Sequence, residues 1–480
     1  ILLKLRFKME KEAVYHHYRR TTDVSISIIR EKYLQFTCVK QNSTTNLSDS
    51  NNKIDVELLI KILYQHFSQP FPTGRITVYD IDYFFNVAVL LAKCKKQTVQ
   101  RLMWWKVVKY LMLLTTKQMR ILRYSISKPT LNYELVPRTK ECLKQIHDLM
   151  PAAVGYKIAT SPKFIATKNK MEEMLSNIKA SFITLVTEAD WMDDVTKLRA
   201  VGKVKAMKHM IGYPEALEEP SYLVALYSEV KIENNNFLKT VINIITANTK
   251  KMLSKLNDIS VKRIIEQHIP DPFLVNAFNT IHFNFIVIPS GILEVPFYGL
   301  GLEALNYGAI GFILAHELTH SFDTQGRLYD EHGKMNNWWS NNTAKQFEIR
   351  AGCFREQYSK YTVRGEKEVN GGITIGENIA DNGGLREAVR AYFKYVEHNG
   401  AEKKLPGLEN YTHEQLLYLA FGIVWCSSGT KEADIWGLGD VHSPSRFRVI
   451  GTLSNMKEFS EVWQCSSKSA MNPTDKCILW

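Results

Sequence analysis

The sequence lacks several patterns that identify common protein classes. None of its seven cysteines forms a CxxC pair, so a cysteine-ligated zinc site is not indicated. No run of about 18 uncharged apolar residues occurs, so no transmembrane helix is predicted. The chain has no internal repeat, low-complexity tract, basic arm, zinc-finger spacing or RNA-binding signature. We therefore interpret its formal charge of +12 as solvated basic helix faces and predict no nucleic-acid partner.

One five-residue segment, HELTH at 316–320, follows an apolar stretch that is typical of a buried helix. On a helix, residues four apart share a face, so His316 and His320 can bind one metal ion together. Glu317 lies beside them and can act on a metal-bound water. An ordinary amphipathic helix with two solvated histidines is the alternative. Buried His and Glu side chains need partners, however, and a metal ion supplies one, so we predict a metal centre.

A catalytic zinc ion needs three protein ligands and an open position for water. No third histidine follows His320 at metzincin spacing, which leaves two histidines and a glutamate as the ligand set. The best candidate is Glu377 in GENIADNGG, where Glu377 and Asp381 lie on one helical face. One of this pair can bind the metal while the other orients a ligand histidine. Asp323 is a second candidate for the orienting role, with a turn aspartate as its alternative.

Six motifs together resemble the neprilysin and endothelin-converting enzyme family of zinc metallopeptidases. They are VNAF, HELTHSFD, GENIADNGGL, DVHSP, FRVIGTLSN and CILW, in this order along the chain. The similarity is nearly continuous from about Trp191 to the C-terminus and includes a segment from Trp191 through Lys203. It is weaker from about Lys32 to Asp190. Because family members carry a longer upstream part, the resemblance implies that this chain is truncated at its N-terminus.

The resemblance implies a role for each matched residue of the metal centre. The zinc ligands that it implies are His316, His320 and Glu377, for one Zn²⁺ per chain. Glu317 resembles the general base that activates the water. Asp323 and Asp381 resemble the carboxylates that hold the two histidines. These ligand types favour zinc among the divalent metals.

The resemblance also implies residues that contact the substrate. His442 resembles the histidine that stabilises the tetrahedral oxyanion, and Arg448 resembles the arginine that grips a substrate carbonyl. Asn276 and Ala277 match the pair that binds the substrate backbone. The matched positions that line the apolar pocket after the scissile bond are Ile292, Phe297, Phe312, Ile313, Val424 and Trp425. Taken singly, His442 is more typical of a surface or core histidine and Arg448 of a salt-bridge partner.

We expect a mainly α, α+β protein. Residues 1–190 are predicted to form a helical N-terminal domain, incomplete relative to the family, and 191–480 a thermolysin-like zincin catalytic domain. In the family, the two enclose a central cavity. Residues 280–289 alternate and are rich in β-branched and aromatic side chains, which predicts a strand. The zinc helix is predicted at about 302–322 and a second helix at 377–398. We interpret the pair Trp104 and Trp105 as core residues.

The resemblance implies an oxidising compartment, at the cell surface or outside the cell, and a disulfide between Cys353 and Cys477. The family partners of Cys142, Cys426 and Cys465 lie further upstream than this chain reaches. Four N-glycosylation sequons agree with secretion. Membrane attachment is expected only through an upstream anchor that this chain does not contain.

Together these features predict a zinc metalloendopeptidase. It would hydrolyse short peptides on the amino side of bulky apolar residues, using a water activated by Glu317. One alternative is a catalytically impaired family member that binds zinc or peptide, because the upstream lobe is missing. Another is a truncated chain that does not fold stably alone, since each lost disulfide removes about 2–5 kcal/mol.

Overall fold

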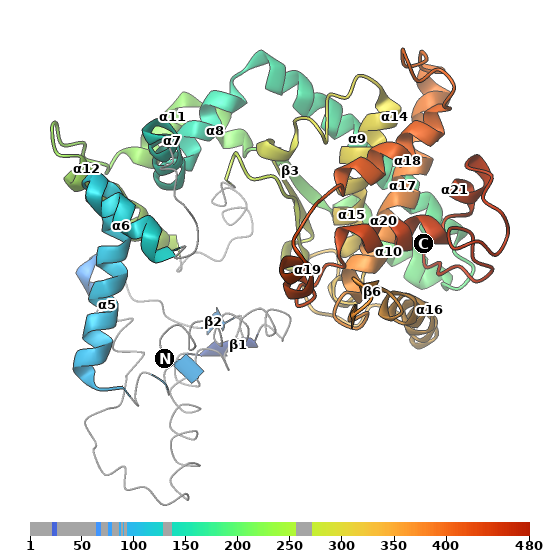
Figure 1. Ribbon diagram of the computed structural model, residues 1–480, viewed down its shortest axis with the longest axis horizontal. Helices are drawn as coiled ribbons and strands as arrows, with labels where there is room; N and C mark the ends of the chain where they lie inside the picture. The colour runs from blue at the N-terminus through green and yellow to red at the C-terminus, as the bar shows by residue number, and fades with distance from the viewer. Residues whose placement is uncertain are drawn as a thin grey trace, which may run out of the picture. The chain divides into compact units, whose positions relative to one another are not determined.

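The computed structural model describes residues 22–25, 64–68, 75–78, 86–87, 90, 94–127, 137–255 and 271–480. Helices dominate the described residues (Figure 1), which confirms the prediction of a mainly α fold. The chain forms two compact units. The first comprises 1–149 and 224–264, and the second comprises 150–223 and 265–480. The domain boundary near residue 190 stays a prediction.

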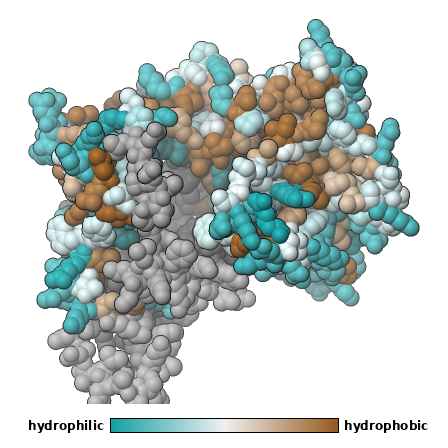
Figure 2. Space-filling view, viewed as in Figure 1, coloured by the Kyte–Doolittle hydropathy of each residue, from teal (hydrophilic) through white to brown (hydrophobic). Residues whose placement is uncertain are grey.

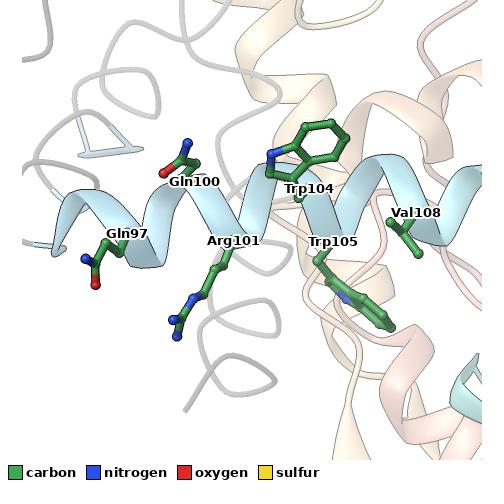
Figure 3. A pocket seen from close by; sticks show the side chains of 6 residues that line it. All are labelled: Gln97, Gln100, Arg101, Trp104, Trp105 and Val108. Carbon is green, nitrogen blue, oxygen red and sulfur yellow. The ribbon is translucent and has the colours of Figure 1, made fainter.

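The first unit contains a two-stranded antiparallel sheet and several helices. Its strands are β1 (Thr22–Ser25) and β2 (Arg75–Val78). Its helices are α5 (Lys96–Leu111), α6 (Lys117–Ser127), α7 (Arg138–Leu149) and α12 (Phe237–Lys255). On α5, Trp104 is 64% exposed and Trp105 is 43% exposed, and both project from the helix in Figure 3. The prediction that this pair forms core is therefore wrong, because apolar character alone does not say which helix face is covered.

The second unit contains a three-stranded sheet with the order β3-β5-β4. β3 (Lys208–Gly212) runs parallel to β5 (Phe285–Pro289), and β4 (Phe278–Thr280) runs antiparallel to β5. The predicted strand at 280–289 is thus confirmed only in its second half. A 3₁₀ turn over Ile281–Phe283 and a left-handed Asn284 (φ 48°) interrupt it. Asparagine adopts the left-handed conformation more readily than most residues. The side chain of Asn284 is held there by two long-range hydrogen bonds, which it donates to the carbonyls of Lys203 and Glu331.

The predicted zinc helix is present as one helical run. It begins with α14 (Glu303–Asn306), continues through a π-helical turn (Tyr307–Gly311) and ends with α15 (Phe312–His320). α15 packs against α9 (Pro162–Glu188) and α17 (Ile375–Asn399), and α14 packs against α18 (His413–Val424). A Cβ atom at Gly308 would lie 2.1 Å from the Leu417 carbonyl oxygen, so this position needs glycine to let α18 approach.

The second unit contains further helices. They are α8 (Pro151–Ala159), α10 (Asp194–Ala206), α16 (Asn341–Ser359), α19 (Lys431–Gly437), α20 (Ser445–Asn455) and α21 (Lys457–Val462). Helix α11 (Pro220–Tyr227) belongs to this unit up to Leu223 and to the first unit from Val224. The disulfide Cys353–Cys477 is present, as predicted, and joins α16 to the C-terminal segment. That segment ends in Trp480, which is buried against the rings of Phe182 and Trp191.

The surface of the second unit is mixed. Figure 2 shows apolar side chains gathered over its upper part and polar side chains around them. Among the described residues, no helix combines the length and the apolar character needed to cross a membrane.

Candidate metal centre

Three side chains from two helices converge on one point in the second unit. His316 and His320 lie one turn apart on α15, and Glu377 lies in the first turn of α17. Their Nε2 atoms are 3.0 Å apart, and Oε2 of Glu377 lies 3.2 Å from the first and 3.4 Å from the second. Among the described residues, these three form the one group of His, Cys, Asp and Glu side chains suited to hold a metal ion.

This group fits a zinc ion. Oε2 of Glu377 is buried and accepts no hydrogen bond of acceptable geometry, although the Nε2 atoms of His316, His320 and His442 lie within 3.4 Å of it. Ligand atoms about 2.0–2.1 Å from a tetrahedral zinc are roughly 3.3 Å apart. The observed separations agree with that arrangement, and the donor set of two imidazoles and a carboxylate is one that zinc prefers.

Two buried carboxylates lie close to the Nδ1 atoms of the two histidines. Nδ1 of His320 lies 2.7 Å from Oδ2 of Asp323, and Nδ1 of His316 lies 2.9 Å from Oδ1 of Asp381. A carboxylate at Nδ1 holds the proton there and leaves Nε2 free for a metal. In the structure Glu377 therefore lies beside both Nε2 atoms and Asp381 lies beside Nδ1 of His316, an arrangement that spacing alone left open.

The charges around the centre shift the pKa values of its members. Burial lowers the pKa of His320, but the carboxylates of Glu377 and Asp323 outweigh it and hold that pKa well above its usual range. Burial raises the pKa of Glu317, against the opposing effect of the two neighbouring histidines. A carboxylate with a raised pKa is better matched to accept and release a proton near neutral pH.

His442 approaches the same point from the segment before α20. Its Nε2 lies 3.2 Å from Oε2 of Glu377, and its Nδ1 lies 2.7 Å from Oδ1 of Asp440. The hydrogen bond with His442, despite an opposing effect of burial, lowers the pKa of Asp440. Asp440 was not predicted as a site residue, although it stands two positions before His442 in the DVHSP motif. Ser443, buried in the same motif, donates a hydrogen bond to Oδ1 of Asn378 beside Glu377.

Arg448 is buried behind the centre on α20. Its Nε and Nη2 donate to the two oxygens of Asp381 at 2.7 and 2.5 Å, and its guanidinium lies 3.7 Å from the centre of the Trp425 ring. Arg448 thus braces the carboxylate that orients His316. The role predicted for it, gripping a substrate carbonyl, stays a prediction.

Comparison with protein families agrees with this geometry. A sequence model described as Peptidase family M13 matches residues 276–479, and a second one of the same description matches 29–214. The chain belongs to peptidase family M13. It is 36% identical over 415 residues to Neprilysin-11 of Caenorhabditis elegans. This match covers 85% of the present chain and 48% of Neprilysin-11. The chain is 37% identical over 414 residues to Endothelin-converting enzyme 1 of Mus musculus, with coverage of 84% and 52%.

The chain therefore spans about half the length of these M13 relatives. Its structure is similar to that of the Mycobacterium tuberculosis zinc metalloprotease Zmp1 in complex with an inhibitor. The TM-score is 0.71 at 28% sequence identity, and the match covers 85% of this chain and 61% of the other.

The residues expected to bind substrate backbone directly precede the edge strand β4 of this M13 chain. Asn276 is exposed and Ala277 is buried, and both directly precede Phe278. Asn279 on β4 donates hydrogen bonds to the Glu317 carbonyl and to Oγ of Ser321, which ties the strand to the zinc helix. The sequence analysis did not identify Asn279, because its hydrogen-bond partners lie about forty positions away in the sequence.

Of the residues expected to line an apolar pocket, Phe312 and Trp425 are in contact with each other. Phe312 is fully buried and packs edge-to-face against Phe421 and Trp425, with ring centres 4.7 and 6.0 Å apart. Trp425 therefore joins the aromatic group beside His316. Of the others, Ile292 and Ile313 are buried, while Phe297 and Val424 are partly exposed. Their assembly into one specificity pocket stays a prediction.

Proposed function

We propose that this chain is the catalytic part of an M13 zinc metalloendopeptidase. The observation that carries the proposal is the convergence of three ligand atoms, from His316, His320 and Glu377, with the buried Glu317 beside them. A zinc ion held there would polarise the scissile carbonyl and acidify a bound water. The impaired alternative is not favoured, because the ligands, the base and His442 are all present around one point.

Glu317, His442 and the two aspartates would each carry out a different part of the remaining chemistry. Glu317 takes the proton of the attacking water and delivers it to the leaving amine. His442, held by Asp440, donates from Nε2 to the oxygen on which negative charge develops, a contact of the kind that removes about 2.7–4 kcal/mol from a barrier. Asp381 and Asp323 keep both ligand histidines in the metal-binding tautomer.

We further propose that the substrates are short peptides cut on the amino side of bulky apolar residues. The edge of β4 can pair with an extended peptide backbone, with Asn276 and Ala277 at its start. The aromatic group of Phe312 and Trp425, with the aliphatic residues predicted beside it, favours an apolar side chain next to the cut. The disulfide Cys353–Cys477 supports a location at the cell surface or outside the cell, because disulfides persist in oxidising compartments.

The test is cleavage of a mixed peptide library by the purified protein, with zinc content measured in parallel. Glu317→Gln should retain zinc and lose cleavage by at least about 100-fold, because it removes the proton acceptor but no ligand. Glu356→Gln, at an exposed position of α16, is the matched control and should cleave normally. The proposal would be refuted if the zinc-loaded wild type cut no peptide, or if zinc-loaded Glu317→Gln cut peptides as fast as the wild type.

A further inference from the structure

Lys203 on α10 is a buried cation with a complete set of hydrogen bonds. It is 1% exposed, and its Nζ donates to the carbonyl oxygens of Ser321, Gly326 and Tyr329 at 2.6, 2.8 and 2.6 Å. An ammonium group has three N–H donors, so three carbonyls satisfy it fully. The three carbonyls belong to one short segment, 321–329, which directly follows the zinc helix.

Carbonyl dipoles and aromatic rings surround the Lys203 ammonium group. The ring centres of Phe322 and Trp338 lie 5.1 and 5.7 Å from Nζ, within reach of a cation–π interaction. Among the described residues no carboxylate forms an ion pair with it. Burial lowers the pKa of Lys203 to about 7, against the more distant carboxylates of Asp323, Asp330 and Glu331. Burying an ammonium is expensive, so a lysine at this position needs its carbonyl partners.

The segment that Lys203 gathers also carries Asp323. Oδ1 of Asp323 accepts hydrogen bonds from the backbone N–H groups of Gln325 and Gly326, both at 2.7 Å, and Oδ2 meets Nδ1 of His320. Gly326 thus binds Asp323 through its N–H and Lys203 through its carbonyl. A Cβ atom at Gly326 would lie 1.8 Å from the His320 carbonyl oxygen, so this turn packs directly beneath the ligand histidine.

We propose that Lys203 is a positioning residue of the metal centre. Its ammonium draws the three carbonyls together, and the turn closed in this way holds the Asp323 carboxylate against His320. The effect runs from Lys203 through Gly326 and Asp323 to Nε2 of His320. The inference rests on the proposed function, because it assumes that His320 binds the metal.

The first test compares zinc release from the wild type and Lys203→Met, measured by transfer of zinc to a chromogenic chelator. Methionine keeps the apolar stem but removes all three donors. Zinc release should become about 10–100-fold faster, the usual effect of losing a residue that orients a ligand. The matched control is Lys179→Met on α9, whose Nζ donates to a single carbonyl, that of Met207. It should release zinc at the wild-type rate.

A double-variant cycle asks whether Lys203 acts through Asp323. Asp323→Asn should also speed zinc release, and the double variant should release zinc no faster than Asp323→Asn alone. Effects that multiply would mean that Lys203 only stabilises the fold. That outcome would overturn the proposal, as would an unchanged rate in Lys203→Met.

A rescue experiment separates the loss of the ammonium group from a general loss of folding. Lys203→Ala leaves a space that matches n-propylammonium, which should slow zinc release in this variant and leave the wild type and Asp323→Asn unaffected. If the variant is folded and the amine has no effect, the carbonyls do not act through a cation and the proposal fails. Zinc release is read without peptide cleavage, so the two proposals fail separately. If the wild type does not bind zinc, the proposed function is refuted. If Lys203→Met binds zinc as well as the wild type does, only the positioning role is refuted.

Discussion

Gly384 on α17 lies directly against the backbone of His316 on α15. A Cβ atom at position 384 would be 2.7 Å from the His316 nitrogen and 2.9 Å from its Cα. Gly384 thus meets rigid backbone, and Gly383 meets the side chain of Thr319. These two glycines let the helices approach closely enough for Glu377 and the histidines to meet.

Gly384→Ala should therefore separate the two helices. We expect a loss of about 1–3 kcal/mol in the free energy of unfolding, as in other overpacked cores, and weaker zinc retention. Gly422→Ala on α18 is the control. Nothing lies within 4 Å of the added methyl group there, so it should be neutral or slightly stabilising. Denaturant unfolding of both variants measures the difference. Equal stability of the two would show that the helices can give way at this contact.

Arg448→Met should destabilise the protein strongly. It leaves the Asp381 carboxylate, which is fully buried, without its charged partner, and breaking such a pair typically removes about 3–5 kcal/mol. Arg364→Met is the matched control, because Arg364 pairs with Asp434 at the surface. It should change the free energy of unfolding by no more than about 1 kcal/mol. A small loss in Arg448→Met would mean that Asp381 takes up a proton or another partner.

Glu387 should make the stability depend on pH. It is fully buried on α17, and its Oε1 lies 2.6 Å from Oγ1 of Thr319, which lies 2.8 Å from the Ala315 carbonyl. Burial holds the pKa of Glu387 well above its usual range, against a smaller opposing effect of Thr319. The Thr319 hydroxyl has one proton, so a neutral Glu387 can donate to it while Thr319 donates to Ala315.

The sign follows from proton binding. Above about pH 4.3 the unfolded chain releases the proton of Glu387 while the folded protein retains it. The stabilisation is complete below that pH and is lost as pH rises toward the folded pKa. Glu387→Gln stays neutral, so its stability relative to the wild type should improve with pH, by up to about 1.4 kcal/mol per pH unit. Unfolding curves between about pH 5 and pH 8.5, at saturating zinc, measure this difference. Parallel pH profiles would show that Glu387 is ionised when folded.

The disulfide should contribute measurably to stability. It joins Cys353 to Cys477, which are 124 positions apart, and its removal is expected to lower the free energy of unfolding by about 2–5 kcal/mol. The double variant Cys353→Ala with Cys477→Ala should therefore melt at a lower temperature than the oxidised wild type. Cys426→Ala removes an exposed free cysteine and serves as the control, with no change expected. A reductant should lower the melting temperature of the wild type and leave the double variant unaffected. If it does not, the bond is absent in solution.

Much of the metal centre could be predicted because its signals are local. Two histidines four apart on an apolar helix must share a face, and GENIAD repeats that spacing for Glu377 and Asp381. The position of the zinc helix followed from the same periodicity, although its π-helical turn did not. The partner of Cys353 came only from the family resemblance. The strand at 280–289 was predicted too long, because alternation does not reveal that Asn284 turns the chain.

The sequence by itself therefore predicted the group of side chains suited to hold a metal, since that depends on residue type and helical spacing. Only the tertiary structure showed that Glu377, and not Asp381, lies beside both Nε2 atoms, since that depends on how α17 lies against α15 at Gly384. It also placed Asp440 against His442, Asn279 against the Glu317 carbonyl and Lys203 against the Ser321 carbonyl. The contacts of Asn279 and Lys203 join residues far apart in the chain, and no local pattern records which distant carbonyl or carboxylate a polar side chain will meet.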